Sequence, residues 1–321
     1  LAAGDPASAV TYLRGAVAKD LENPEARLLL GQAYLAQGHA QPAAKELNRA
    51  LTLGHDPVRT SILLARAHIM ASEREKALEV LNKLPDSEQS RGDVAALRSA
   101  AQLEVEEVLE AAVGNLESLL EADPENVEAA RALALVSLRN EQLDAARNFA
   151  SQALRLRELD LPMWILSGNI ELKAQEYAAA LPLFEQAMKF EPQSAPGILG
   201  IVRARIGLGE FDSAKNELGR LLTAFPDHPE YNFLKALIAA EQDDDALARE
   251  ALQKALSSDA NHPSSLLMYG VIQHKEGNLD QARSLLQRYI TQEPDDLLGR
   301  KALATVHLSS QEPALAVAVL E

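Results

Sequence analysis

Alanine recurs at a fixed spacing through this 321-residue chain, and the spacing restricts the fold more than any other feature. Consecutive members lie 34 residues apart, except for one step of 35 between Ala77 and Ala112. Such a period is typical of stacked helical repeats, in which each unit buries its apolar face against its neighbours. The alanines are Ala9, Ala43, Ala77, Ala112, Ala146, Ala180, Ala214, Ala248, Ala282 and Ala316. The position four residues later is always apolar: Leu13, Leu47, Leu81, Leu116, Ala150, Phe184, Leu218, Leu252, Leu286 and Leu320.

The unit from Trp164 to Pro192 shows the pattern most completely. Trp164 and Gly168 lie one turn apart on a first expected helix, where the glycine allows a neighbouring helix to approach closely. A second helix ends before Pro192, as helices commonly do near proline. Together with Tyr177, Ala180, Phe184 and Ala187, these residues resemble the tetratricopeptide repeat (TPR). Ser167 stands where that repeat has leucine, and Glu171 stands where it has tyrosine.

The resemblance implies an all-α, right-handed superhelical solenoid of antiparallel helix pairs. Proline-containing turns separate the units, because the residue before proline is disfavoured in a helix. We expect one solenoid over 1–321, with partial repeats at 1–23 and 297–321, so the chain is predicted to be a piece of a longer protein. The full repeats are expected at 24–57, 58–92, 93–126, 127–160, 161–194, 195–228, 229–262 and 263–296. The unit 93–126 is the least regular, and its small residues predict a loosely filled interface.

Composition supports the helical prediction and excludes several functions. The chain is 47% hydrophobic but only 4% aromatic, which favours a core of leucine and alanine over strands. A formal net charge of −16 opposes nucleic-acid binding, which needs clustered basic residues. The chain has no cysteine, so disulfides and thiol chemistry are excluded, and no apolar run reaches the length of a membrane span.

No combination of residues indicates catalysis or a bound cofactor. The seven histidines lack the helical spacing of a zinc protease motif, and phosphate-binding glycine loops are absent. Glu104, Glu106, Glu107 and Glu110 spread around a helix and its turn, as expected for a solvated face. We therefore predict a protein that is not an enzyme and holds no metal or cofactor.

The predicted binding surface is the concave groove that TPR first helices line. Two positions on each first helix should face it, one directly after the Trp164 position and one a turn later. Three of these residues, Arg66, Arg131 and Arg203, are arginines in an acidic chain. Because a guanidinium group suits carboxylates, we expect a protein or peptide partner with apolar anchors and an acidic or C-terminal carboxylate group. The predicted site comprises Leu28, Gln32, Ile62, Arg66, Leu97, Arg131, Ile165, Asn169, Leu199, Arg203, Phe233 and Leu267.

Two alternatives concern these positions. The arginines could instead pair with neighbouring glutamates. The carboxylate clamp of chaperone-binding TPR domains is not favoured, since Leu28, Gln32, Ile62 and Arg66 do not match its lysine and asparagine positions. Exchange of Arg66, Arg131 and Arg203 for glutamate is predicted to abolish partner capture with helicity intact.

A narrower resemblance concerns the first third of the chain. PEARLLLGQAYLAQG from Pro24, KELNRALTLGHDP from Lys45 and LLARAHIMASEREKALEVL from Leu63 are similar to TPR lipoproteins of the exosortase (PEP-CTERM) and exopolysaccharide systems of Gram-negative bacteria. That resemblance implies an envelope scaffold with a lipid anchor, in the periplasm or at the outer membrane; a cytoplasmic location is the alternative. A second functional hypothesis is the substrate-recognition arm of a larger enzyme whose catalytic domain lies outside these residues.

Overall fold

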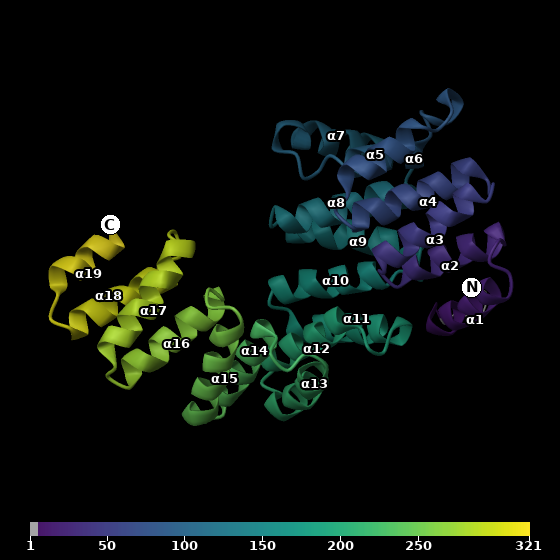
Figure 1. Ribbon diagram of the computed structural model, residues 1–321. Coiled ribbons are helices and arrows are strands. Elements are labelled where there is room, and N and C mark those ends of the chain that lie inside the picture. The colour runs from purple at the N-terminus through teal and green to yellow at the C-terminus, as the bar shows by residue number, and fades with distance from the viewer. Residues whose placement is uncertain (1–5) are drawn as a thin grey trace. The chain divides into compact units, whose positions relative to one another are not determined.

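The chain folds into helices throughout the part that is described. The computed structural model describes the backbone of residues 6–321 and the side chains of residues 8–321, and this part contains nineteen α-helices and no strand. The all-α solenoid class is thereby confirmed (Figure 1). The helices are α1 (Pro6–Lys19), α2 (Pro24–Ala36), α3 (Ala40–Thr52), α4 (Pro57–Met70), α5 (Arg74–Asn82), α6 (Gly92–Ala100), α7 (Glu106–Ala122), α8 (Val127–Arg139), α9 (Leu143–Leu156), α10 (Leu161–Lys173), α11 (Tyr177–Phe190), α12 (Ala195–Gly207), α13 (Phe211–Ala224), α14 (Pro229–Glu241), α15 (Asp245–Ser258), α16 (Pro263–Lys275), α17 (Leu279–Gln292), α18 (Leu297–Ser309) and α19 (Pro313–Leu320).

Turn chemistry sets where these helices begin. Asn23 caps α2, because its side-chain oxygen accepts a hydrogen bond from the Ala26 amide at 2.9 Å, and a proline follows as the first helical residue. Asp56 caps α4 in the same way, through the amides of Val58 and Arg59. The X-Pro steps of the sequence therefore end one helix and start the next.

The turn inside eight helix pairs contains one residue in the left-handed backbone region, again at the repeat spacing. Glycine occupies this position at Gly38, with φ of +77°, but a side chain is present in five other repeats. A left-handed non-glycine residue costs about 1 kcal/mol, so the turn geometry must be required by the packing of the two helices. The left-handed turn residues are Gly38, Ser72, Glu141, Gln175, Gly209, Asp243, Gly277 and Gln311. Residues 93–126 have no such turn.

The core uses small residues to bring helices together. Phe184 on α11 is fully buried between two helical glycines, Gly168 on α10 and Gly200 on α12. A Cβ atom added to Gly200 would lie 2.2 Å from the Phe184 ring, so no larger residue fits there without movement. Because Gly168 and Gly200 have no side chain, the Phe184 ring fits between α10 and α12.

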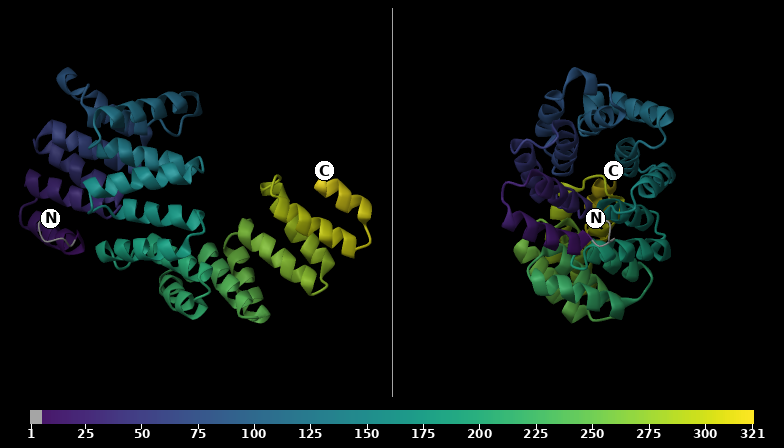
Figure 2. Two further views of the ribbon diagram at one scale, coloured as in Figure 1. Left: turned by 180° about the vertical axis from the view of Figure 1, so that it is seen from behind. Right: turned by 90° about the vertical axis from the view of Figure 1, so that its right-hand side faces the viewer.

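The chain divides into two compact units, Leu1–Ala204 and Arg205–Glu321, with the boundary in the last turn of α12. In unit 1, the helices run from purple through blue to teal around a common centre, which the right-hand view of Figure 2 shows. Unit 2 contains the last turn of α12 and the helices α13 to α19. The irregular repeat lies in unit 1: α6 has nine residues and α7 has seventeen.

Candidate functional site

Unit 1 contains a cavity of about 780 Å³, here called the inner cavity. Its wall is formed by the C-terminal ends of α2 and α4, by α6, α8 and α10, and by the segment that leads into α12. These first helices of successive pairs face the common centre seen in Figure 2. The repeat pattern therefore generates a shared concave face.

One side of the inner cavity is closed by a contact between distant parts of the chain. The turn after α2 reaches the beginning of α10, where a Cβ atom placed on Gly38 would lie 3.2 Å from Cγ of Pro162. Beside it, Nε2 of His39 lies 3.2 Å from Oε1 of Glu191, which follows α11. We call these two interactions the closing contact. Because all four residues line the cavity, the contact makes one of its walls.

The apolar part of the wall contains small residues from the irregular repeat. Ala100 and Ala101 line the cavity next to Leu97, at the end of the short helix α6. The helix α8, which packs against α6, contributes Leu135, which is 52% exposed. An exposed leucine beside small apolar residues provides a surface on which an apolar ligand group can be buried.

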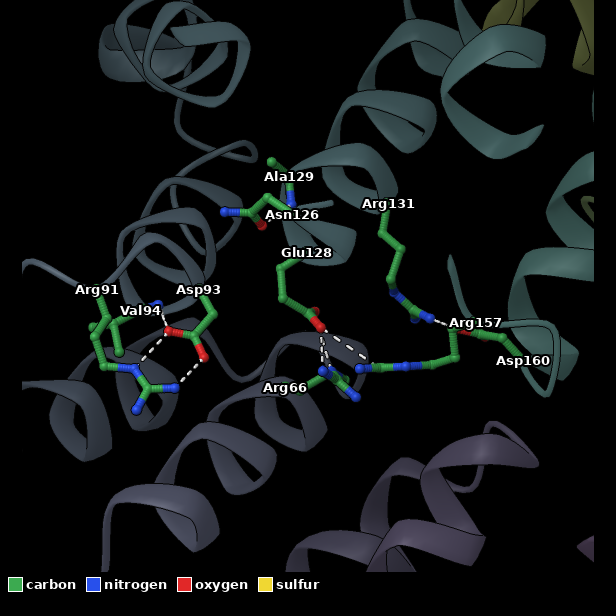
Figure 3. A network of polar contacts seen from close by, with 10 residues as sticks. All are labelled: Arg66, Arg91, Asp93, Val94, Asn126, Glu128, Ala129, Arg131, Arg157 and Asp160. Carbon is green, nitrogen blue, oxygen red and sulfur yellow. Dashed lines mark hydrogen bonds and ion pairs between the residues drawn. The ribbon is translucent and has the colours of Figure 1, made fainter. Parts of the chain in front are cut away.

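A network of charged side chains lies at the same cavity, and three of its members, Arg66, Glu128 and Arg131, line the cavity (Figure 3). Arg66 on α4 donates two hydrogen bonds to Glu128 on α8, and Arg157 at the end of α9 lies 3.5 Å from the same carboxylate. Arg131, one turn after Glu128, forms an ion pair with Asp160. Asp160 also accepts from the amide of Met163 and so caps α10. We call these five charged residues the ion network; it connects α4, α8, α9 and α10.

Burial and neighbouring charges both shift the pKa values of residues in the ion network. Burial alone would raise the pKa of Glu128, but the guanidinium groups of Arg66, Arg131 and Arg157 outweigh it and hold that pKa below its ordinary value. Burial, together with Arg66 and Arg157, lowers the pKa of Arg131 to about 10. Arg157 also falls to a pKa of about 10, first through burial. At neutral pH the Glu128 carboxyl is therefore ionised, and Arg131 and Arg157 remain protonated.

The inner cavity differs in charge from the rest of the chain. Four arginines line it against three glutamates, whereas the whole chain has a formal net charge of −16. Arg139, at the end of α8, is exposed and has no ion-pair partner among the residues described. A guanidinium group without a partner at the edge of an apolar cavity is suited to a carboxylate. The four arginines are Arg66, Arg74, Arg131 and Arg139, and the glutamates are Glu104, Glu128 and Glu191.

The structure brings five of the predicted site residues together in the inner cavity. They are Arg66, Leu97, Arg131, Ile165 and Asn169. The alternative, in which the arginines pair with carboxylates, describes two of them. Arg66 donates hydrogen bonds to Glu128, and Arg131 forms an ion pair with Asp160.

Several other predicted residues lie elsewhere. Leu28 is 0% exposed and Ile62 is also buried, so both belong to the core, because the helix turns these positions toward neighbouring helices. Gln32 and Leu199 are half-buried and lie outside the wall of the inner cavity. Arg203 is exposed and lines a hollow of about 710 Å³ with Arg139, Asn169, Lys173 and Tyr177.

Phe233 and Leu267 belong to unit 2. They line a separate pocket of about 630 Å³ between α14 and α16, with Leu237, Met268 and Val271. One polar pair is at this pocket, where Lys275 lies 3.0 Å from Asp245. The predicted groove residues are therefore distributed over both units. The five that line the inner cavity all belong to unit 1.

Sequence reasoning missed Glu128 and Asp160, which hold the cavity arginines. Glu128 lies one helical turn before Arg131, a spacing at which opposite charges interact on a helix, so the pair could have been found from the sequence. Asp160 stands directly before a helix that has proline near its start, which is typical of an N-cap. Both carboxylates also contact arginines from other helices, and no local sequence pattern predicts these contacts.

Within residues 6–321, no group of three or more histidine, aspartate or glutamate side chains could hold a metal ion. None of the helices in this part is long and apolar enough to cross a membrane.

Helix pairs at a 34-residue period, stacked around a concave cavity, define a helical-repeat solenoid. Tetratricopeptide repeat family models match residues 1–59, 171–238 and 239–306, more than half of the chain, and a second such model matches 101–160. The chain belongs to the tetratricopeptide repeat family.

Comparison with individual proteins supports this assignment at low identity. A Bos taurus protein, BBSome complex member BBS4, is 22% identical over 260 residues, which are 81% of this chain and 49% of that protein. The chain thus spans about half the length of this relative. A tetratricopeptide repeat protein from Parabacteroides merdae covers 78% of the chain and 98% of its own, with a TM-score of 0.60 and 13% identity. Yeast Tom70 covers 99% of the chain and 81% of its own, with a TM-score of 0.56 and 14% identity. These two structures share the fold.

Proposed function

We propose that this chain is a non-catalytic scaffold that binds a peptide segment of a partner protein in the inner cavity of unit 1. The observation that supports this most directly is an apolar cavity edged by an unpartnered arginine in a strongly acidic chain. Helical solenoids generally use such concave faces for binding. The BBS4 relative is, by its description, a member of a complex, which agrees with a scaffold.

The proposed ligand has apolar side chains and one carboxylate. Its apolar groups pack against Leu97, Ala101, Leu135 and Ile165. Its carboxylate, at a C-terminus or on an acidic side chain, binds Arg139 at the open end of the wall. Arg66 and Arg131 also line the cavity, but their hydrogen-bonding groups face Glu128 and Asp160. The carboxylate is therefore assigned to the exposed Arg139 and not to Arg66 or Arg131.

The proposed binding site does not depend on the cellular pathway in which the chain acts. A scaffold in bacterial envelope export and a recognition arm of a larger enzyme would both place a peptide in the same cavity. The two roles differ in the partner and in what lies outside these residues. The binding test below therefore applies to both.

The test is a selection of random peptides with free C-termini on the immobilised chain, followed by fluorescence anisotropy with labelled synthetic peptides. We expect Leu135→Glu to abolish binding and Arg139→Glu to weaken it at least about tenfold, the value of one lost charge-assisted hydrogen bond. Arg59→Glu is the matched control, because Arg59 is exposed on α4 outside the cavity. Selected peptides that bind Leu135→Glu as well as the unchanged chain would reject the inner cavity as the site. Equal affinity of the free acid and its amide would reject the carboxylate.

A further inference from the structure

A second cavity of unit 1, of about 530 Å³, lies between α9, α10 and α11. We call it the tryptophan cavity, because Trp164 lines it. It shares no lining residue with the inner cavity, and α10 contributes different side chains to the two. Ser151 and Arg155, which are exposed on α9, also line it, so the cavity is open to solvent.

This cavity exists because two core positions are smaller here than in other repeats. Ala150 stands where every other repeat has leucine or phenylalanine. Ser167 stands where five of the other repeats have leucine or isoleucine. Both residues line the tryptophan cavity, and protein cores are otherwise filled to high density. The five large residues at the Ser167 position are Leu30, Leu64, Leu133, Ile201 and Leu303, all of them buried.

Hydrogen bonds fix part of the cavity wall. Arg147 donates from Nε and Nη2 to the two carboxylate oxygens of Glu171, both at 2.8 Å, which neutralises the charge of each group. The indole Nε1 of Trp164 donates to the carbonyl oxygen of Glu158 at 2.9 Å and so holds the ring. These groups are therefore occupied by the protein itself.

Three other donors at the cavity are available to a ligand. The guanidinium group of Arg155 and the hydroxyl groups of Ser151 and Ser167 have no partner among the described residues. The apolar part of the wall includes Leu154 and Leu183, and Glu158 also lines the cavity. An arginine with nearby hydroxyls suits a carboxylate, and a hydrocarbon body suits the apolar wall.

We propose that the tryptophan cavity binds a small monocarboxylic acid with an apolar body. The hydrocarbon fills the space beside Ala150 and Ser167 that leucine-sized residues occupy in other repeats. The carboxylate accepts hydrogen bonds from Arg155 and the two serine hydroxyls. The volume lies in the range usual for small-molecule sites, about 300–1,000 Å³. The proposal is independent of the peptide bound in the inner cavity.

The experiment uses the fluorescence of Trp164, which is the single tryptophan of the chain and reports on this cavity directly. The chain is titrated with hexanoate, 1-hexanol and hexylamine, which share one hydrocarbon body. We expect hexanoate to change the emission with a millimolar or lower Kd, and the alcohol and amine to bind at least about tenfold more weakly. Absence of any response to hexanoate, or equal responses to the three compounds, would overturn the proposal.

Two kinds of variant place the ligand. Ser167→Leu restores the large residue of other repeats and fills the cavity, so the hexanoate response should be lost while helicity, measured by circular dichroism, is kept. Ala150→Val fills the same space from α9 and serves as a second variant if the first does not fold. Arg155→Gln should weaken hexanoate about tenfold and leave hexanol unchanged. An undiminished hexanoate response in both filled variants would show that the acid binds elsewhere.

Discussion

Arg66 donates from Nε to Oε2 of Glu128 at 3.1 Å, although α4 and α8 belong to repeats that are not consecutive. The irregular repeat stands between them in the sequence, with its short helix α6. In a solenoid each repeat normally contacts only its neighbours. This ion pair therefore couples repeats that a regular array would keep independent.

Removal of the Glu128 charge should destabilise unit 1. Glu128→Gln leaves three arginines with one carboxylate in a buried site, and a broken buried pair costs about 3–5 kcal/mol. Urea denaturation followed by circular dichroism measures the loss. Glu107→Gln is the control, because Glu107 is exposed on α7. Coincident unfolding midpoints for the two variants would contradict a stabilising role of the ion network.

Acid should weaken the folded state through the same carboxylate. The pKa of Glu128 is lowered in the folded chain, so its contribution to stability is complete above the unfolded pKa of about 4.3. The contribution is lost as the pH falls from that value through the lower, folded pKa. The free energy of unfolding should therefore decline with acidification in this range, and less steeply in Glu128→Gln. Parallel pH profiles for both proteins would assign the acid sensitivity to other groups.

Exchange of the cavity arginines for glutamate should affect folding before it affects binding. Arg66→Glu and Arg131→Glu would each place a third carboxylate beside Glu128 and Asp160, where attraction becomes repulsion. We expect a large loss of stability in the double variant, whereas the sequence predicted intact helicity for the triple exchange that also includes Arg203. Thermal melts by circular dichroism measure the loss, with the surface variant Arg59→Glu as the reference. A double variant that melts with the reference would contradict the expected repulsion.

The glycines around Phe184 should not tolerate a methyl group. Gly200→Ala places a Cβ atom 2.2 Å from the Phe184 ring. Overpacking of this kind typically costs about 1–3 kcal/mol. Gly219→Ala in α13 is the matched control, since nothing lies within 4 Å of its Cβ position. There the substitution should stabilise by about 0.5–1 kcal/mol, because alanine is the better helix former. Chemical denaturation of both variants should therefore give shifts of opposite sign, and shifts of one sign would contradict this packing.

The closing contact can be tested by cross-linking, because the chain has no cysteine of its own. His39→Cys combined with Glu191→Cys should be joined within one molecule by a short thiol-reactive cross-linker such as dibromobimane. The product should be a fast-migrating monomer band on a denaturing gel. The two single-cysteine variants are the controls and should give none. Failure of the double variant to cross-link would mean that this side of the inner cavity is open in solution.

The sequence contains enough information for the repeat architecture and too little for the site. Alanine at the Ala180 position is a packing residue that every repeat supplies, so its spacing reveals the helix pairs. Leu28 and Leu97 occupy equivalent positions and are both buried, yet only Leu97 also lines a cavity. The difference depends on the short helix α6 and on contacts between distant repeats, which no local pattern encodes.

The closing contact has a consequence for how this array can vary. Gly38 and Pro162 meet only because a set number of repeats, each with its own rotation, lies between them. Insertion or deletion of one 34-residue unit in that interval would carry Pro162 past its partner. In unit 2, a gain or loss of repeats would disturb only the new neighbours. The interval between Gly38 and Pro162 is therefore the part of the array in which repeat number should be held fixed.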